Sequence, residues 1–345
     1  MKLAATCAAS TLILGLMSAH APAALAADKN FNIKISLWAP TTHPLYAAMQ
    51  DWGESIAKAS GGTLKYTIYP SEQLGKAFDH YDMARDGIAD MTYVSPGYQP
   101  GRFPIFAAGA LPFLMSDAKG GTRAFDAWYR KYAEREMRDV KMCVAFVHDP
   151  GGIHSRSKKV VMPSDIAGMK IRPANSTIAT FVTALGGTNV QASAFESRDV
   201  IEKGVADAIT FPWGSTVLYG IDKVTGYHLN APLYVSTFVF AFSKNKYMQM
   251  SAAQKKVIDE HCNNEWAGRI AQGWADFEHA GIAKIAAEPG QQVYGLNDSQ
   301  LRAWKQAAEP MRKDWSQAAR KAGVDPDQVL KELEASLEKF GASAK

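Results

Sequence analysis

Strand-like and helix-like hydrophobic patterns alternate along the first part of the chain. Residues 32–38 alternate polar and apolar side chains, which predicts a half-buried strand, and His43-Pro44 then opens a helix that Gly61-Gly62 ends. The next predicted elements are a strand at 64–69, a helix around 77–85, a strand at 91–94, a helix around 117–138 and a strand at 141–147. This order predicts an α/β fold with a largely parallel sheet covered by helices.

The alternation restarts after a sharp break at 149–152, which reads Asp-Pro-Gly-Gly. The elements predicted next are a strand at 169–172, a helix at 176–185, a strand edge at 189–190, a helix at 194–204 and a strand at 208–211. They indicate a second α/β lobe. Residues 234–243 are apolar without alternation, which predicts one long strand buried on both faces that carries the chain back to the first lobe.

The last third of the chain has helical periodicity. No proline occurs between Ser251 and Glu288, and Ser251-Ala-Ala-Gln254 matches a capping box. We expect one very long helix, or two in series, lying across both lobes. Residues 299–340 are also predicted to be helical, with a charged outer face.

The first 26 residues have the features of a secretory signal peptide. Lys2 supplies a positive start, an apolar stretch follows at 11–17, and Ala24-Leu-Ala26 is a small-residue cleavage site. The apolar stretch is too short to span a bilayer core of about 30 Å. We therefore expect residues 1–26 to be removed on export, leaving a periplasmic chain without stable membrane insertion.

Composition and charge exclude several classes of protein. The 345 residues are 47% hydrophobic and 21% charged, which excludes a disordered chain. A net charge of +4 over this length gives no reason to expect a nucleic-acid partner. Two cysteines lie beyond the signal peptide, Cys143 and Cys262. They would be able to pair in an oxidising compartment, whereas a small buried thiol is the simpler expectation for Cys143 in its apolar strand.

Catalytic signatures are mostly absent. The chain has no His-Glu-x-x-His, Gly-x-Ser-x-Gly or Gly-x-Gly-x-x-Gly motif. Ser55-Ile-Ala-Lys58 matches the Ser-x-x-Lys of penicillin-recognising enzymes, but the partner motifs of that class are missing. His148 and His154 have no companion at a strong metal-ligand spacing. We expect a chain that is not an enzyme and that has neither a metal site nor a cofactor.

Arg172 is the residue with the clearest chemical meaning. It ends a short apolar strand just before the predicted helix at 176–185, and open α/β sheets bind ligands beyond the carboxyl ends of their strands. A guanidinium matches a carboxylate with two parallel charge-assisted hydrogen bonds. From the residues alone, a surface or structural salt bridge is an equal alternative.

An ordered set of motifs extends over the mature chain, at 69–75, 86–91, 111–114, 164–172 and 202–207. Together they resemble the DctP family, the extracytoplasmic solute receptors of tripartite ATP-independent periplasmic (TRAP) transporters. The resemblance implies a two-lobed, type II-like periplasmic binding protein that closes on a small organic acid and delivers it to TRAP membrane permease subunits. It also implies that Arg172 clamps the ligand carboxylate.

The resemblance further implies lobes that are discontinuous in sequence, with a long helix spanning both. The first lobe would comprise 27–149 and 238–276, and the second 150–237 and 277–345. Many family members carry a second arginine in a Gly-x-Arg context shortly after the first crossing. Here His154 and Arg156 are offset from that position, so a second ligand carboxylate is in doubt.

Further ligand contacts are expected around the strand ends. His43 begins a helix whose N-terminus favours an anion, so His43 would contact the ligand. Glu72 would orient Arg172 or accept a ligand hydroxyl, and Asn189 would bind the carboxylate or its α-substituent. Rings near strand ends would stack on an aromatic or bulky ligand, although core packing is the ordinary role of such rings. These rings are Trp38, Tyr69, Tyr93, Tyr98, Phe211, Trp213 and Tyr234, with Phe211 and Trp213 favoured for the ligand. The nine predicted ligand contacts are Arg172, His43, Glu72, Tyr93, His154, Asn189, Phe211, Trp213 and Tyr234.

Two other interpretations remain open at this point. One is a secreted α/β enzyme that acts on a small acid, and it would need a nucleophile and base or a metal site. The other is the binding protein of another importer or of a sensor. The sequence does not name the acid, which would be aromatic, or a keto or hydroxy acid.

Overall fold

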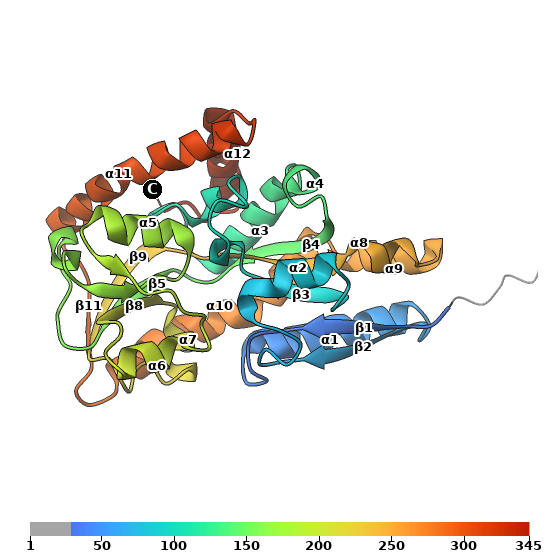
Figure 1. The fold of residues 1–345 in the computed structure, drawn as a ribbon, viewed down its shortest axis with the longest axis horizontal. Coiled ribbons are helices and arrows are strands. Elements are labelled where there is room, and N and C mark those ends of the chain that lie inside the picture. Colours follow the sequence, from blue (N-terminus) through green and yellow to red (C-terminus); the bar gives the residue numbers. More distant parts are fainter. Residues whose placement is uncertain (1–28, 345) are drawn as a thin grey trace, which may run out of the picture.

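The computed structural model describes residues 29–344, which form two mixed β-sheets with helices packed against them (Figure 1). The predicted signal peptide at 1–26 lies outside these residues. The α/β fold class is confirmed, and each sheet forms the centre of one lobe. Within the described residues, no helix is both long enough and apolar enough to cross a membrane.

The sheet of the first lobe has the strand order β2-β1-β3-β10-β4. β1 is parallel to β2 and β3, whereas β10 is antiparallel to its neighbours β3 and β4. Every residue of β10 is buried, as expected for an apolar strand with a partner on each side. The bounds are β1 Phe31–Ser36, β2 Leu64–Tyr69, β3 Met91–Val94, β4 Val140–Val147 and β10 Thr237–Ser243.

The sheet of the second lobe has the strand order β11-β9-β5-β8-β6-β7. β6 is parallel to β7 and β8, and β5 is antiparallel to β8 and β9. Short β6 therefore ends at the same edge as β8, which places residues that follow both strands close together. The bounds are β5 Gly151–Ser155, β6 Lys170–Arg172, β7 Thr188–Asn189, β8 Ala208–Phe211, β9 Tyr227–Tyr234 and β11 Gln292–Tyr294.

The helices begin and end at recognisable signals. α1 (Pro44–Ala59) has His43 as its N-cap and buries the apolar positions that the sequence pattern marks. The other helices are α2 His80–Arg85, α3 Ala118–Tyr129, α4 Ala133–Glu136, α5 Ser176–Ala184, α6 Ser197–Glu202, α7 Trp213–Leu218, α8 Lys244–Met248, α9 Ala252–His261, α10 Asn264–Ala286, α11 Asp298–Lys321 and α12 Pro326–Lys339. α12 packs against α3, at the end of the red segment in Figure 1.

The single strand predicted at 234–243 is wrong. β9 ends at Tyr234 and β10 begins at Thr237, and the two strands belong to different sheets. Leu233 and Tyr234 at the end of β9 are buried, and every residue of β10 is buried. Val235 and Ser236, which join the strands, are buried as well, so the crossing lies inside a buried stretch and no exposed residue marks it.

Of the two arrangements predicted for 251–288, two helices in series is confirmed. α9 ends at His261, and Asn263 caps α10 by accepting a hydrogen bond from the backbone N–H of Trp266. α10 packs against α1 and α3 in the first lobe and against α7 in the second, so it bridges the two sheets (Figure 1). At the α7 contact an added Cβ on Gly281 would lie 2.2 Å from the nitrogen of Gly214, which only glycine tolerates. The residue ranges predicted for the two lobes stay a prediction.

Cys143 and Cys262 form a disulfide bond, so the expectation of a free buried thiol at Cys143 is wrong. Cys143 lies in β4 and Cys262 directly follows α9. The bond therefore ties the first sheet to the segment that leads into α10. An apolar strand pattern does not distinguish a buried thiol from a buried half-cystine, since both are compact and apolar.

Replacing both cysteines by alanine should lower the free energy of unfolding. The bond joins positions 119 residues apart, and closing a loop of that length restricts the unfolded chain by about 4–5 kcal/mol on the entropic estimate. Urea unfolding of Cys143→Ala/Cys262→Ala should show a lower midpoint than the oxidised wild type. Dithiothreitol should lower the wild-type midpoint and leave that of the variant unchanged. Equal midpoints for the variant and the oxidised wild type would contradict this account.

Candidate functional site

A cavity lies between the two lobes, at the ends of strands from both sheets. Its walls come from loops after β1, β4, β6 and β8, from α7 and from α10. The lining residues are Trp38, His43, Tyr98, His148, Arg172, Ala174, Ala194, Phe211, Pro212, Ser215, Tyr219, Ser236, Phe238 and Trp274.

Arg172, the last residue of β6, is only 1% exposed. Its Nε donates to the carbonyl oxygen of Ala192 at 3.0 Å, and its Nη2 donates to the hydroxyl of Tyr98 at 2.9 Å. Across residues 29–344, no carboxylate oxygen lies within ion-pair distance of this guanidinium. The salt bridge that the sequence left open is therefore not formed, and the cavity holds a buried, unpaired positive charge.

Tyr98 joins the two lobes at this point. It belongs to a 3₁₀ turn, Pro96–Tyr98, that follows β3 of the first sheet. Its hydroxyl accepts hydrogen bonds from Arg172 and from the backbone N–H of Ala194 at 3.0 Å, both in the second lobe. Its ring stacks on Phe78, with centroids 4.8 Å apart. These contacts hold the lobes in a closed arrangement.

Aromatic rings make up much of the cavity wall. Trp38 stacks on Tyr93 with centroids 4.3 Å apart, and its indole N–H donates to the Tyr93 carbonyl. Phe238 packs against Trp274 at 5.3 Å, and Phe211 lies 5.5 Å from the Arg172 guanidinium carbon. A flat apolar ligand would therefore meet rings from both lobes.

The two histidines of the cavity are neutral. Burial lowers the pKa of His43 to about 3 and that of His148 to about 4. Nδ1 of His43 accepts the backbone N–H of Leu45 at 3.2 Å, and Nε2 of His148 accepts that of Ser236 at 3.0 Å. Arg172 is consequently the cation among the lining residues.

Three of the nine predicted contact residues line the cavity: Arg172, His43 and Phe211. Tyr93 lies one layer behind, under the ring of Trp38. The structure does not bring Glu72 or Asn189 to the cavity. Glu72 accepts from the backbone N–H of Ala77 and pairs with Lys76, and Asn189 is exposed and donates to α5.

The other three predicted residues lie in the core of the second lobe. His154 packs edge-on against Trp213 at 4.9 Å and shares a 2.8 Å Nδ1–Nδ1 contact with His228. Tyr234 packs edge-on against His148. His154 lies in β5, Trp213 begins α7 and Tyr234 ends β9, and none of the three is among the residues that line the cavity. Position near the end of an element does not by itself fix which way a side chain points.

Five lining residues that matter were not among the predicted contacts: Trp38, Tyr98, Tyr219, Phe238 and Trp274. Trp38 and Tyr98 belong to the strand-end rings for which core packing was favoured. Trp274 is an apolar position of α10, indistinguishable by periodicity from residues that only pack between helix and sheet.

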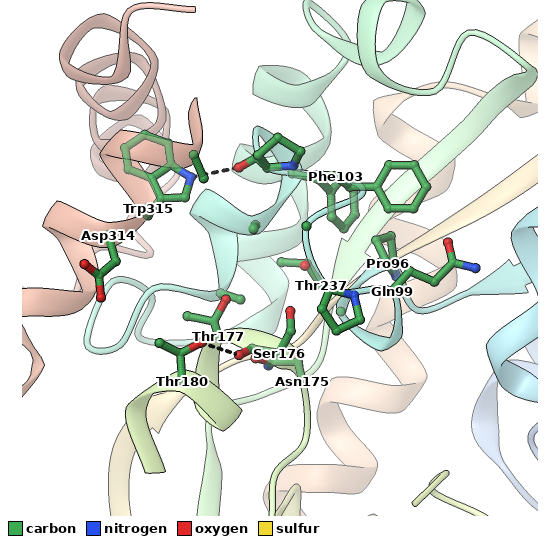
Figure 2. Close-up of a pocket in the computed structure, with 18 of the residues that line it drawn as sticks. Pro96, Gln99, Phe103, Asn175, Ser176, Thr177, Thr180, Thr237, Asp314 and Trp315 are labelled. Carbon is green, nitrogen blue, oxygen red and sulfur yellow. Dashed lines mark hydrogen bonds between the residues drawn. The ribbon is translucent and has the colours of Figure 1, made fainter. Parts of the chain in front are cut away.

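A second, wider groove lies between the start of α5, α11 and the loop that follows β3. Figure 2 shows Ser176, Thr177 and Thr180 of α5 on one side of it and Asp314 and Trp315 of α11 on the other. Its lining includes the carboxylate of Asp314 and no lysine, arginine or histidine. An organic anion would meet a like charge there, so the Arg172 cavity is the candidate site.

A buried carboxyl group lies directly behind the cavity wall. Glu278 of α10 is 1% exposed and accepts hydrogen bonds from the Ser215 backbone N–H at 2.9 Å, the Ser215 hydroxyl and the Trp274 indole N–H. It therefore holds two lining residues in place, one from each side of the α7–α10 contact. Burial raises the pKa of Glu278 to about 7.

Comparison with known proteins identifies related chains. Residues 35–318 match the DctP model, described as bacterial extracellular solute-binding protein, family 7. A TRAP solute-binding protein from Rhodoferax ferrireducens, solved with copurified benzoate, superposes with a TM-score of 0.85 at 26% identity. The match covers 90% of this chain and 99% of that one.

Two further solved structures have similar folds. A marine metagenome TRAP solute-binding protein described as specific for aromatic acid ligands, in complex with 3-hydroxybenzoate, has a TM-score of 0.84 at 30% identity. A TRAP periplasmic solute-binding protein from Bordetella bronchiseptica with bound (R)- and (S)-mandelate has a TM-score of 0.84 at 26% identity. Each match covers 90% of this chain and 99% of the other.

Glu278→Gln should change how stability depends on pH. The raised pKa means that the folded state keeps its proton while the unfolded state loses it between pH 4.5 and about 7, so the wild type loses stability over this window. A pKa difference of this size corresponds to a change on the order of 3 kcal/mol. Glutamine does not ionise, so the variant should not lose stability in this way. In urea unfolding, the free energy of unfolding of the variant should therefore rise relative to that of the wild type as pH rises.

The buried histidines titrate in both proteins, so their effect cancels in this comparison. Asp276→Asn, an exposed position two residues earlier on α10, is the matched control and should follow the wild-type profile above pH 5. A stability difference between Glu278→Gln and wild type that stays constant from pH 4.5 to 8 would show that Glu278 ionises normally.

Proposed function

The chain belongs to the DctP family of bacterial extracellular solute-binding proteins, and on that premise we propose that it captures a small aromatic monocarboxylate in the periplasm. It would deliver this acid to the membrane subunits of a TRAP transporter. The observation that carries the proposal is the unpaired guanidinium of Arg172, buried in a cavity walled by aromatic rings.

The charge of the cavity favours one carboxylate. A buried charge is costly unless it is paired, and the ligand carboxylate supplies the partner that the described chain does not. Nε of Arg172 is already bonded to Ala192, and Nη1 has no hydrogen-bond partner among residues 29–344. Arg172 is the only cation in the lining, so a second ligand carboxylate would have no countercharge there.

The wall of the cavity favours an aromatic ring beside that carboxylate. Trp38, Phe211, Phe238 and Trp274 present ring surfaces to the cavity. The related proteins from Rhodoferax ferrireducens, the marine metagenome and Bordetella bronchiseptica hold benzoate, 3-hydroxybenzoate and mandelate, each an aromatic monocarboxylate. These ligands support the same ligand class for the present chain.

The energies involved are adequate for micromolar binding. A hydrogen bond to a charged group contributes about 1.5–3 kcal/mol net, so a carboxylate that accepts two from Arg172 gains about 3–6 kcal/mol. Enclosing a ring of about 150 Å² contributes about 4 kcal/mol at 25 cal/mol per Å². A micromolar Kd corresponds to about 8 kcal/mol. The arginine clamp and the aromatic enclosure are therefore both needed, and neither is sufficient alone.

Closure of the lobes completes the site. The ligand carboxylate would bind Arg172 in the second lobe, while the rings of Trp38 and Phe238 reach it from the first. A ligand that contacts both lobes binds the closed form better and so shifts the equilibrium towards it. The hydrogen bonds of Tyr98 with Arg172 and Ala194 join the two lobes, so separation of the lobes would break them.

Arg172→Ala should abolish high-affinity binding of the aromatic acid. A thermal-shift screen of the mature wild type over benzoate, hydroxybenzoates, mandelate, aliphatic keto acids and dicarboxylates first identifies the tightest ligand. Saturation at 1,000 times Kd stabilises a folded protein by about 4 kcal/mol. Calorimetric titration with that ligand should then show Kd at least about 100-fold higher for Arg172→Ala.

Arg156→Ala is the matched control, because Arg156 is the other arginine near the lobe crossing and is exposed. Its Kd should equal that of the wild type. Arg172→Lys should bind weakly, since an ammonium keeps the charge but not the planar fork. An unchanged Kd for folded Arg172→Ala would place the carboxylate elsewhere, and the absence of any carboxylate ligand would overturn the proposed function.

A further inference from the structure

His43 presents an unused hydrogen-bond donor to the cavity. The residue is 2% exposed, and its Nδ1 accepts the backbone N–H of Leu45 as the N-cap of α1. Because Nδ1 accepts, the proton of the neutral ring lies on Nε2. No described residue accepts a hydrogen bond from Nε2, although the ring lines the cavity. A bound ligand that covers this N–H without accepting from it would leave the donor unpaired, which is unfavourable, so the donor favours ligands that carry an acceptor.

The donor of His43 is separated from the guanidinium of Arg172 by the aromatic wall. The rings nearest to each differ: Tyr98 and Phe211 for Arg172, and Trp274 and Phe277 for His43. The two residues also come from different lobes, His43 after β1 and Arg172 at the end of β6. A group bound by His43 would therefore belong to a different part of the ligand from the carboxylate.

The rings between these two ends form a continuous surface. Trp38 lies 6.3 Å from Tyr98 and 6.4 Å from Phe238, and Phe238 lies 5.3 Å from Trp274, measured between ring centroids. Trp274 in turn meets the His43 ring at 5.0 Å. An aromatic ligand lying along this surface would have its carboxylate at one end and a ring substituent at the other.

We propose that the physiological ligand is an aromatic monocarboxylate with an oxygen substituent on its ring, and that His43 selects it by donating from Nε2 to that oxygen. This inference rests on the proposed function and names the ligand class within it. A hydroxyl, oxo or methoxy oxygen satisfies the donor. An ammonium group does not, because it has no lone pair to accept the bond.

The Tyr219 hydroxyl is a second unpartnered group at the cavity, but it belongs to the other end. It is buried and forms no hydrogen bond within the described chain. Its ring packs on Phe211 at 5.8 Å, and Phe211 is the ring beside Arg172. Tyr219 therefore serves the carboxylate end and should not distinguish between ring substituents. This difference makes Tyr219→Phe a matched control.

The test compares ligand pairs on three forms of the mature protein: wild type, His43→Asn and Tyr219→Phe. Asparagine retains an N-cap oxygen for α1 but is too short to replace the Nε2 donor. Calorimetry gives Kd for benzoate, 3-hydroxybenzoate, 4-hydroxybenzoate and 3-aminobenzoate. We expect the better hydroxybenzoate to bind wild type about tenfold tighter than benzoate, the size of one hydrogen bond in a closed site. 3-Aminobenzoate should lack this gain, because its neutral aryl amine is a poor hydrogen-bond acceptor: the nitrogen lone pair is delocalised into the ring.

In His43→Asn, the better hydroxybenzoate should lose its preference, so that its Kd equals that of benzoate. The Kd of benzoate itself should stay within about threefold of the wild-type value. Tyr219→Phe should weaken benzoate and hydroxybenzoate alike and keep the preference. The inference is overturned if neither hydroxybenzoate exceeds benzoate on wild type, or if the preference survives in His43→Asn. It is also overturned if only mandelate, compared with phenylacetate, depends on His43, because that would place the oxygen beside the carboxylate.

The two proposals fail in distinguishable ways. If no aromatic acid binds the wild type, the proposed function fails, and the inference about His43 fails with it. If benzoate binds through Arg172 but all preferences are independent of His43, the function stands and this inference falls. Thermal unfolding of His43→Asn without ligand checks that α1 is intact, and His43→Ser provides a second variant with a favoured N-cap side chain, also too short to replace the Nε2 donor, if it is not.

Discussion

The buried guanidinium of Arg172, which has no carboxylate partner in the described chain, is the feature on which the binding properties of the cavity depend. Arg172 is 1% exposed, and its contacts are a carbonyl, a phenol hydroxyl and two ring faces. These neighbours hold the guanidinium in place but leave its charge uncompensated. Burial of this kind is unfavourable in the absence of an anion, so a ligand carboxylate gains both an attraction and the removal of that unfavourable state.

The fold explains how this charge comes to face an apolar wall. The ends of parallel strands from two sheets meet at the same cavity, and α10 contacts helices of both lobes. The close approach at Gly281 fixes α10 against α7, and the Glu278 hydrogen bonds with Ser215 and Trp274 orient two lining residues from that contact. The ring surface, the cation and the unused donor of His43 are thus placed by separate elements.

Most elements of the first lobe, the α/β class and the location of Arg172 at a strand end could be predicted from the sequence, because periodicity and turn residues are local signals. The strands β5, β11 and most of β9 could not. The direction of side chains could not. Tyr234 and Trp213 lie on buried strand and helix ends yet pack in the second lobe, while Tyr98 reaches Arg172 only because two lobes close on each other. The sequence pattern also did not reveal that the chain crosses between the lobes at Val235, because the residues on both sides of this position are buried.

The central claim is that the ligand is held by its negative charge against Arg172 and not only by ring packing. The most direct measurement is the Kd of the tightest-binding aromatic acid and of its primary carboxamide, which has nearly the same shape but no charge, by calorimetry on the wild-type protein. The account predicts that the amide binds at least about 100-fold more weakly. Equal affinity for the acid and the amide would contradict it.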